Sequence, residues 1–316
     1  MTSRDIVRNT IRFKGAPRLP HEFPEQLGYK SDVYRCGMEP SLDTRLREGV
    51  DEWGSVWRNV GNSALGEVRD FPIKNWSDFT EDMIPDINAH DRFAHLTNLR
   101  EKVGEKYIIG NGISLYERVH FLRGLENTWL DIYEEPENLC KLLDILVDMN
   151  LEAIKRYAEL GCDGYLFCDD WGLQNTLMIN PEKWREFWKP RYKKIYAAAH
   201  SYDMDTFLHS CGYITDILDD LIEVGLDVIH MDQQENMGLE NLSARFKGRI
   251  TFFSTADIQT ILPSNDIGKI TAYCKDMKRL LATDKGGFMP CWYSDPVGVG
   301  HTKEAICAMC DAFLRP

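Results

Sequence analysis

Three residues carry side chains that bind soft divalent metal ions, and they stand where strands are expected to end. His209 and Cys211 are separated by one residue, so on an extended backbone their side chains point the same way. Cys291 lies 80 positions beyond Cys211, and two strand ends can bring the three together. One imidazole and two thiolates suit Zn²⁺, and three protein ligands leave a fourth position open for chemistry. The alternative is buried, inert thiols, because the chain has nine cysteines and free cysteine packs like a small apolar side chain.

Acidic side chains follow other expected strands. Asp169 and Asp170 come directly after the apolar stretch 164–168, and because neighbouring residues point to opposite sides, only one of them faces the site. That carboxyl can accept hydrogen bonds from a substrate or exchange a proton, whereas capping of the next helix is an equally weighted alternative. Glu117 is a further candidate, as a proton donor, an additional metal ligand or a partner of Arg118.

Other side chains at strand ends are candidates for binding a small molecule. They are Asn111, Trp171, Gln174, His230, Trp292 and Tyr293. The aromatic members suit a flat apolar ligand if they are exposed. The alternatives are solvation of polar loop residues and packing of the aromatic rings between a barrel and its helices.

The elements that must position these residues alternate along the chain. Short apolar stretches predict strands at 32–37, 107–111, 164–168, 206–208, 226–230 and 250–253, with a last strand from 288. Helical spacing predicts an N-terminal helix from residue 3 and helices at 92–103, 115–125, 136–160, 181–200, 213–223, 239–246, 267–281 and 302–314. This alternation is typical of parallel βα units, and the chain length favours an α/β fold of the (β/α)₈ TIM-barrel type. We predict one domain over 1–316, with an N-terminal extension made of the first helix and a β-hairpin that begins near residue 50 and turns at Gly61-Asn62.

Composition limits the classes of function. The chain has 316 residues, of which 43% are hydrophobic and 28% charged, and a net charge of −13. This composition supports a large core and excludes the basic surface that nucleic acids require. No apolar run approaches the roughly 18 residues of a membrane span, and we expect no signal peptide in the first residues, which are charged. We therefore expect a cytoplasmic protein with reduced thiols and no nucleic-acid or membrane partner.

Four segments carry a resemblance to a known family. They are Asp51-Glu52-Trp53-Gly54, Ser114-Leu115-Tyr116-Glu117-Arg118, Asp169-Asp170-Trp171-Gly172, and His209-Ser210-Cys211-Gly212 with the helical stretch that follows it. Over nearly its whole length the chain resembles the uroporphyrinogen decarboxylase superfamily, and within it the zinc-containing, cobalamin-dependent methyltransferases. The resemblance implies a (β/α)₈ barrel with His209, Cys211 and Cys291 as zinc ligands. The chain departs from the decarboxylase pattern because it has no Arg-Gln-Ala-Gly-Arg segment to hold substrate carboxylates.

The resemblance implies an enzyme that moves a methyl group between a small substrate and a corrinoid. A separate protein would carry the corrinoid, because this chain has no Asp-x-His-x-x-Gly motif. With a methoxylated aromatic donor, zinc and an acid such as Glu117, Asp169 or Asp170 would stabilise the departing phenolate. With a thiol acceptor, zinc would hold the attacking thiolate. Two other hypotheses are a metal-free decarboxylase of a tetrapyrrole, and a non-catalytic barrel that carries or senses a corrinoid.

Overall fold

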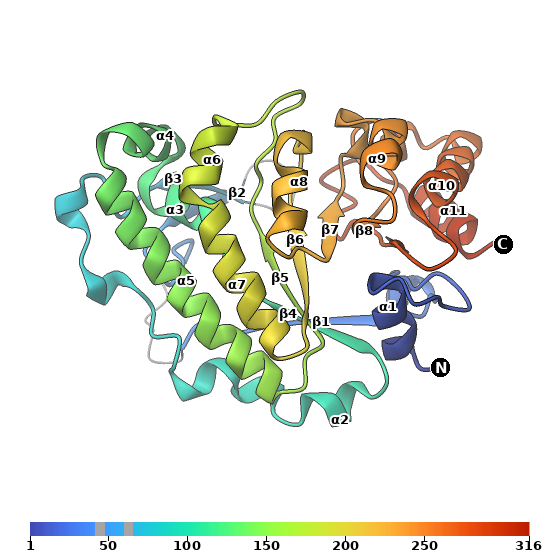
Figure 1. Cartoon of the computed structure of the whole chain (residues 1–316), viewed down its shortest axis with the longest axis horizontal. Coiled ribbons are helices and arrows are strands. Elements are labelled where there is room, and N and C mark those ends of the chain that lie inside the picture. The colour runs from blue at the N-terminus through green and yellow to red at the C-terminus, as the bar shows by residue number, and fades with distance from the viewer. Residues whose placement is uncertain (42–47, 60–65, 316) are drawn as a thin grey trace.

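The computed structural model describes residues 1–41, 48–59 and 66–315 (Figure 1). At its centre is a sheet of seven parallel strands in the order β1-β4-β5-β6-β7-β8-β9. Their bounds are β1 Val33–Gly37, β4 Tyr107–Asn111, β5 Gly164–Cys168, β6 Asp205–His209, β7 Val228–Met231, β8 Thr251–Ser254 and β9 Phe288–Pro290. Strands β4 to β9 are mostly buried, because helices cover their outer face and inward side chains fill the other.

The sheet curls into a barrel, and its eighth position is filled without a strand in the described part of the chain. There the N–H of Glu22 donates to the carbonyl of Pro290 at 3.1 Å, and the N–H of Asp32 donates to the carbonyl of His21 at 2.9 Å. Two residues thus link β9 to the start of β1. Prolines flank this pair in the sequence, and a strand ends there because proline has no N–H to donate. The predicted TIM barrel is confirmed, with seven full strands instead of eight.

Helices connect the strands and lie outside the sheet (Figure 1). Their bounds are α1 Ser3–Ile11, α2 Leu99–Val103, α3 Tyr116–Arg123, α4 Leu125–Glu134, α5 Pro136–Glu159, α6 Pro181–Phe187, α7 Lys189–Ser201, α8 Thr215–Glu223, α9 Leu239–Phe246, α10 Ile267–Leu281 and α11 Lys303–Leu314. Helices α9 and α10 have the predicted bounds, and α4 was not predicted.

Two predicted helices are interrupted. The stretch 92–103 contains a 3₁₀ helix, His90–Leu96, followed by the short α2. The stretch 181–200 is divided at Trp188 into α6 and α7. Pro190 explains the second break, because its ring has no N–H and collides with the carbonyl of the preceding turn.

Helix α1 packs against the end of the barrel where the strands begin. Val7 and Ile11 join the apolar cluster of the barrel interior. The fully buried carboxylate of Asp163 binds three arginines around this end, Arg4 at 2.6 Å, Arg8 at 3.5 Å and Arg100. The strand starts are thereby closed, and the opposite, carboxyl-terminal ends remain for a site.

The predicted β-hairpin is present. Strands β2 (Val56–Asn59) and β3 (Gly66–Asp70) pair antiparallel, whereas the predicted turn at Gly61-Asn62 lies outside the described residues. Within the described ranges, no helix combines the length and the apolar character that crossing a bilayer requires.

Candidate metal and substrate site

The predicted metal ligands lie in the uppermost layer of the barrel interior. The strand register places Cys168 of β5 beside His209 of β6, and His209 beside His230 of β7. Because alternate residues of a strand point to the same side, Phe207 and Val228 form the apolar layer beneath them. The barrel therefore presents imidazoles and thiols together at the mouth, above an apolar floor.

Asp170, His209 and Cys211 form the first group of donor atoms. His209 Nε2 lies 3.4 Å from Cys211 Sγ and 3.6 Å from Asp170 Oδ1. The Cys211 N–H also donates to Asp170 Oδ1 at 2.7 Å, which fixes this carboxylate beside the thiol. Neighbouring ligand atoms around a tetrahedral zinc ion lie roughly 3.3 to 3.8 Å apart, given bonds of about 2.0 to 2.3 Å. This group of residues therefore fits zinc.

Cys291 joins the same cluster through His230. Its thiol lies 3.5 Å from His230 Nε2, and the Nδ1 atoms of His230 and His209 are 2.8 Å apart, so one ring donates a hydrogen bond to the other. Asp232 Oδ1 is 3.8 Å from His230 Nε2. Among the described residues, the groups whose donor atoms all lie within 4.8 Å of one another are Asp170-His209-Cys211 and His209-His230-Asp232. Cys291 belongs to neither group, and His230 lies between it and His209.

Burial sets the protonation of this cluster. It raises the pKa of the Cys211 and Cys291 thiols, and nearby carboxylates raise both further. Burial, together with His209 and Arg35, lowers the pKa of His230, which is therefore a neutral imidazole. Thiolates form here when a cation compensates their charge, as a divalent metal does.

Two glycines allow the loops after β5 and β6 to meet. Gly212 has φ +75°, and a Cβ on it would lie 2.3 Å from the carbonyl oxygen of Gly172. A Cβ on Gly172 would lie 2.2 Å from the backbone nitrogen of Tyr213. Since both contacts are with backbone, neither loop can yield easily. This close approach brings Asp170 next to Cys211.

The structure assigns different places to the two adjacent acids. Asp169 is fully buried and accepts hydrogen bonds from the N–H groups of Leu115 and Glu117 and from the hydroxyl of Tyr192. Burial raises its pKa to about 7, although these hydrogen bonds oppose the shift. Asp170 faces the candidate ligands His209 and Cys211. Asp169 therefore anchors the first turn of α3, and Asp170 is the acid that faces the site.

Glu117 stands on this anchored turn. Its carboxyl accepts a hydrogen bond from Ser114 Oγ at 3.2 Å. Burial raises its pKa to about 8, and the charges of Asp170 and Asp169 add to the shift. In the metal-free protein Glu117 therefore carries a proton at neutral pH, as a general acid must.

The predicted substrate-binding residues differ in how far they are exposed. Asn111 is exposed at the end of β4, and Trp292 and Tyr293 are partly buried just after β9. Tyr293 lies close enough to Asp232 and Cys211 for their charges to help burial raise its pKa to about 12. Trp171, in contrast, is fully buried and stacks on Tyr116, so the expectation that it lines the mouth is wrong. Gln174 is exposed in the turn 173–176.

A cavity of about 280 Å³ lies beside Glu117 and was not predicted from the sequence. It is lined by the ends of β1 and β4, by Glu52 and Trp53, and by the side chains of Arg92 and Arg118. The sequence signal that could have found it is the pair of family segments containing Trp53 and Arg118, which lie far apart in the chain and meet here.

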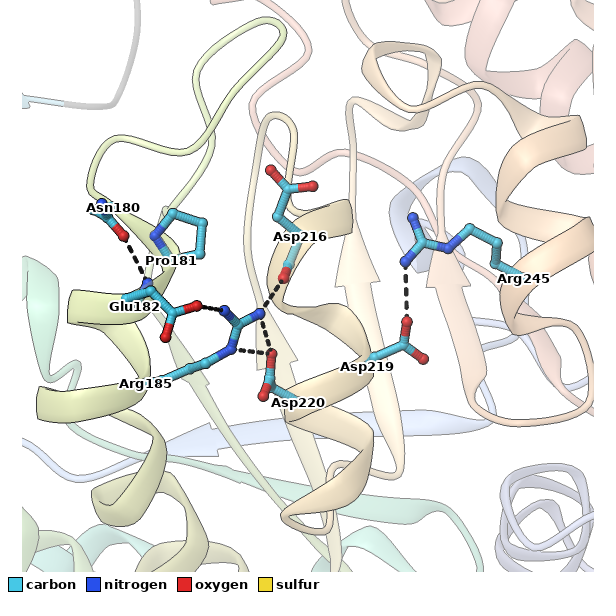
Figure 2. A pocket seen from close by; sticks show the side chains of 8 residues that line it. All are labelled: Asn180, Pro181, Glu182, Arg185, Asp216, Asp219, Asp220 and Arg245. Atoms are coloured by element: carbon cyan, nitrogen blue, oxygen red, sulfur yellow. Dashed lines mark hydrogen bonds and ion pairs between the residues drawn. The ribbon is translucent and has the colours of Figure 1, made fainter.

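A larger groove of about 430 Å³ lies on the outside, between α6, α8 and the side chain of Arg245 (Figure 2). Ion pairs occupy its polar groups. Arg185 donates to Asp220 and Glu182, and to the carbonyl of Asp216. Arg245 pairs with Asp219 at 3.0 Å. The polar groups of this groove therefore form a salt-bridge network that joins helices.

Comparison with known proteins identifies the family. The sequence pattern of the uroporphyrinogen decarboxylase (URO-D) family matches residues 72–259, more than half of the chain. The chain belongs to this family. The predicted resemblance is thereby confirmed, and the matched region contains Glu117, Asp170, His209 and Cys211.

The relatives found are methyltransferases. Methylcobamide:CoM methyltransferase MtbA of Methanosarcina acetivorans is 29% identical over 138 residues, and MtbA of Methanosarcina mazei is 28% identical over the same length. Each match covers 43% of this chain and 40% of the relative, so it spans less than half of either protein. A solved structure described as a methyltransferase from Methanosarcina mazei shares the fold, with a TM-score of 0.72 and 15% identity over 99% of this chain and 98% of that one.

Proposed function

We propose that this protein is a zinc-dependent methyltransferase that moves a methyl group between a small substrate and the corrinoid of a partner protein. The observation that carries the proposal is the convergence of His209, Cys211 and Asp170 in the mouth of a URO-D barrel, with Cys291 joined through His230. The methyltransferase names of the relatives support the same reaction class.

His209, Cys211 and Cys291 would hold the zinc ion, and Asp170 is placed to be a fourth ligand that a substrate displaces. Bound zinc would supply a Lewis acid at the mouth of the barrel. His230 fixes the orientation of the His209 ring through their 2.8 Å contact, in the way that a partner of a ligating histidine usually does.

Glu117 would be the proton donor. The corrinoid of the partner protein would accept the methyl group of a methyl ether, and the electron pair of the broken carbon–oxygen bond would stay on the ether oxygen. That oxygen takes the proton of Glu117, and water later returns a proton to the carboxylate. Asp169 holds Glu117 in place through the backbone and does not touch the substrate.

A methoxylated aromatic compound is the substrate we favour, which makes the reaction an O-demethylation. Tyr293 supports it as an aromatic ring close to Cys211 and Asp232, and Trp292 is the neighbouring residue in the chain. A thiol acceptor is the second candidate, because the matched relatives are named for methyl transfer to CoM. The corrinoid protein would dock transiently over the mouth of the barrel in either case. Decarboxylation of a tetrapyrrole is the third candidate, which the family name keeps open.

Metal analysis and a methylation assay test the proposal. The purified protein should contain about one zinc per chain, and it should methylate cob(I)alamin with at least one member of a panel of methoxylated aromatic compounds, or demethylate methylcobalamin with a thiol. Cys211→Ser and Cys291→Ser should each lose zinc, whereas Cys274→Ser, a buried cysteine of α10, should keep it. Full zinc content in the first two variants would show that the ligands are wrongly assigned. Absence of both metal and methyl transfer would favour a decarboxylase.

A further inference from the structure

One carboxylate organises the segment that covers the cavity beside Glu117. Asp51 accepts hydrogen bonds from the N–H groups of Trp53 and Ser55 and from the indole of Trp57. It also accepts a hydrogen bond from Arg118 Nη1 at 2.9 Å. The same carboxylate therefore holds the turn that starts at Asp51 and binds the guanidinium of Arg118.

The surroundings of Arg118 hold its guanidinium in one orientation. The Cζ atom lies 4.7 Å from the ring centroid of Trp53 and 5.5 Å from that of Phe121. Such contacts immobilise a planar cation without occupying its hydrogen-bond donors. The side chain is 18% exposed, so a ligand can reach it from the cavity.

One edge of this guanidinium is left without an acceptor. Among the described residues, Asp51 is the acceptor of Arg118, and it contacts Nη1 only. The Nε–H is buried and has no hydrogen-bond partner. Nε and Nη2 together form the fork that binds a carboxylate or sulfonate through two parallel hydrogen bonds.

Other arginines are engaged differently. Both Nη atoms of Arg92 are bound by Glu52, at 2.6 and 2.7 Å. Arg35 uses Nε and Nη2, the fork itself, on Glu22. Arg185 of the outer groove donates from all three nitrogens (Figure 2). Arg118 thus combines a free fork, rigid support and a place in a cavity next to the candidate acid.

We propose that Arg118 binds a carboxylate or sulfonate of the small substrate in the cavity between β1, β4 and α3, through Nε and Nη2. This inference rests on the proposed function and narrows its substrate to molecules with an acidic group. Asn111 and Ser114 also line the cavity, and Ser114 contacts Glu117, so a bound acid lies next to the proposed proton donor. The volume of about 280 Å³ suits a small molecule.

Binding of matched acid and neutral probes tests this inference without methyl transfer. One pair is 4-methoxybenzoate and 4-methoxybenzamide, and the other is 2-mercaptoethanesulfonate and 2-mercaptoethanol. Calorimetry with the zinc-loaded protein should show that the acid of at least one pair binds about 10- to 100-fold more tightly than its neutral partner, as a two-fold charge-assisted contact predicts. The pair that responds tells whether the acidic group belongs to an aromatic compound or to a thiol.

Variants then assign the preference to Arg118. Arg118→Gln should reduce the acid-to-neutral ratio to about one, and Arg118→Lys, which keeps the charge but not the fork, should reduce it to a few-fold. Arg245→Gln removes a cation from the outer groove and should leave the ratio unchanged. Thermal melting checks that each variant is folded. If Arg118→Gln is not folded, the acid-to-neutral ratio of Arg118→Lys tests the inference.

The inference is overturned if the wild-type protein prefers neither acid, or if the ratio survives in both Arg118 variants. Its failure is distinguishable from failure of the proposed function. Zinc content and methyl transfer test the function, and they can persist when the acid preference is absent. Conversely, a preference that depends on Arg118 without methyl transfer would retain the binding site and reject the proposed reaction.

Discussion

Asp169→Asn tests whether a buried acid controls the candidate proton donor. In the wild-type protein Oδ2 of Asp169 accepts from Leu115 N–H at 3.2 Å and from the Tyr192 hydroxyl at 2.6 Å, while Oδ1 accepts from Glu117 N–H at 3.0 Å. Asparagine has a single oxygen acceptor. We expect that oxygen to take the Oδ2 position, where it serves two donors, so that the amide NH₂ faces the N–H of Glu117.

The size of the effect follows from these contacts. A buried N–H that loses its acceptor costs about 1–3 kcal/mol, so the free energy of unfolding should fall by that amount. The turn that carries Glu117 would move away from the new NH₂ group. A displacement of about 1 Å in a positioning element costs up to about 100-fold in rate, and we expect methyl transfer to slow by about 10- to 100-fold.

A double-mutant cycle measures whether Asp169 acts through Glu117. Methyl transfer is compared in the wild-type protein, Asp169→Asn, Glu117→Gln and the double variant, with urea unfolding as the measure of stability. If Asp169 positions Glu117, then Asp169→Asn should slow the Glu117→Gln protein by no more than about 3-fold, because the acid is already lost. Equal slowing in both backgrounds would refute the positioning role.

Burial and neighbouring carboxylates raise the pKa of Glu117 to about 8, so its protonated form is present at neutral pH and is lost above pH 8. The rate of methyl transfer should therefore fall as the pH rises past 8. A pH–rate profile of Glu117→Gln should lack this fall, and its rate should be about 10²- to 10⁴-fold lower. Asp163→Asn should lower the free energy of unfolding by about 3 kcal/mol in urea titrations, because a buried carboxylate no longer compensates three arginines, whereas zinc content should not change at the far end of the barrel. Gly212→Ala should reduce zinc content and thermal stability together, since its Cβ would press on the Gly172 carbonyl, and unchanged metal content would show that the two loops can separate without moving Cys211.

Several features could be predicted from the sequence because they are local. The spacing of apolar residues indicated the alternation of strands and helices, and helices such as α9 and α10 have the predicted bounds. The His-x-Cys spacing indicated that both side chains point into one space, and the structure has them 3.4 Å apart. Where local signals conflict, prediction was less good, as at Pro190, which divides a helix that the pattern alone continues.

Other features depend on how distant strands and loops meet. Sequence alternation requires Asp169 and Asp170 to face opposite sides, but the packing of α3 and of the loop after β6 decides that Asp170 faces His209 and Cys211. The contact of His209 with His230 comes from the register of β6 and β7.

The sequence by itself determined the barrel class and the kinds of ligand atom available to a metal. The tertiary structure decided which of these ligand atoms come together. It also decided that Trp171 is packed in the core and that Asp51 binds Arg118. The physical reason is that periodicity fixes the directions of side chains within one element, whereas contacts between elements depend on the register, twist and packing that the whole chain adopts.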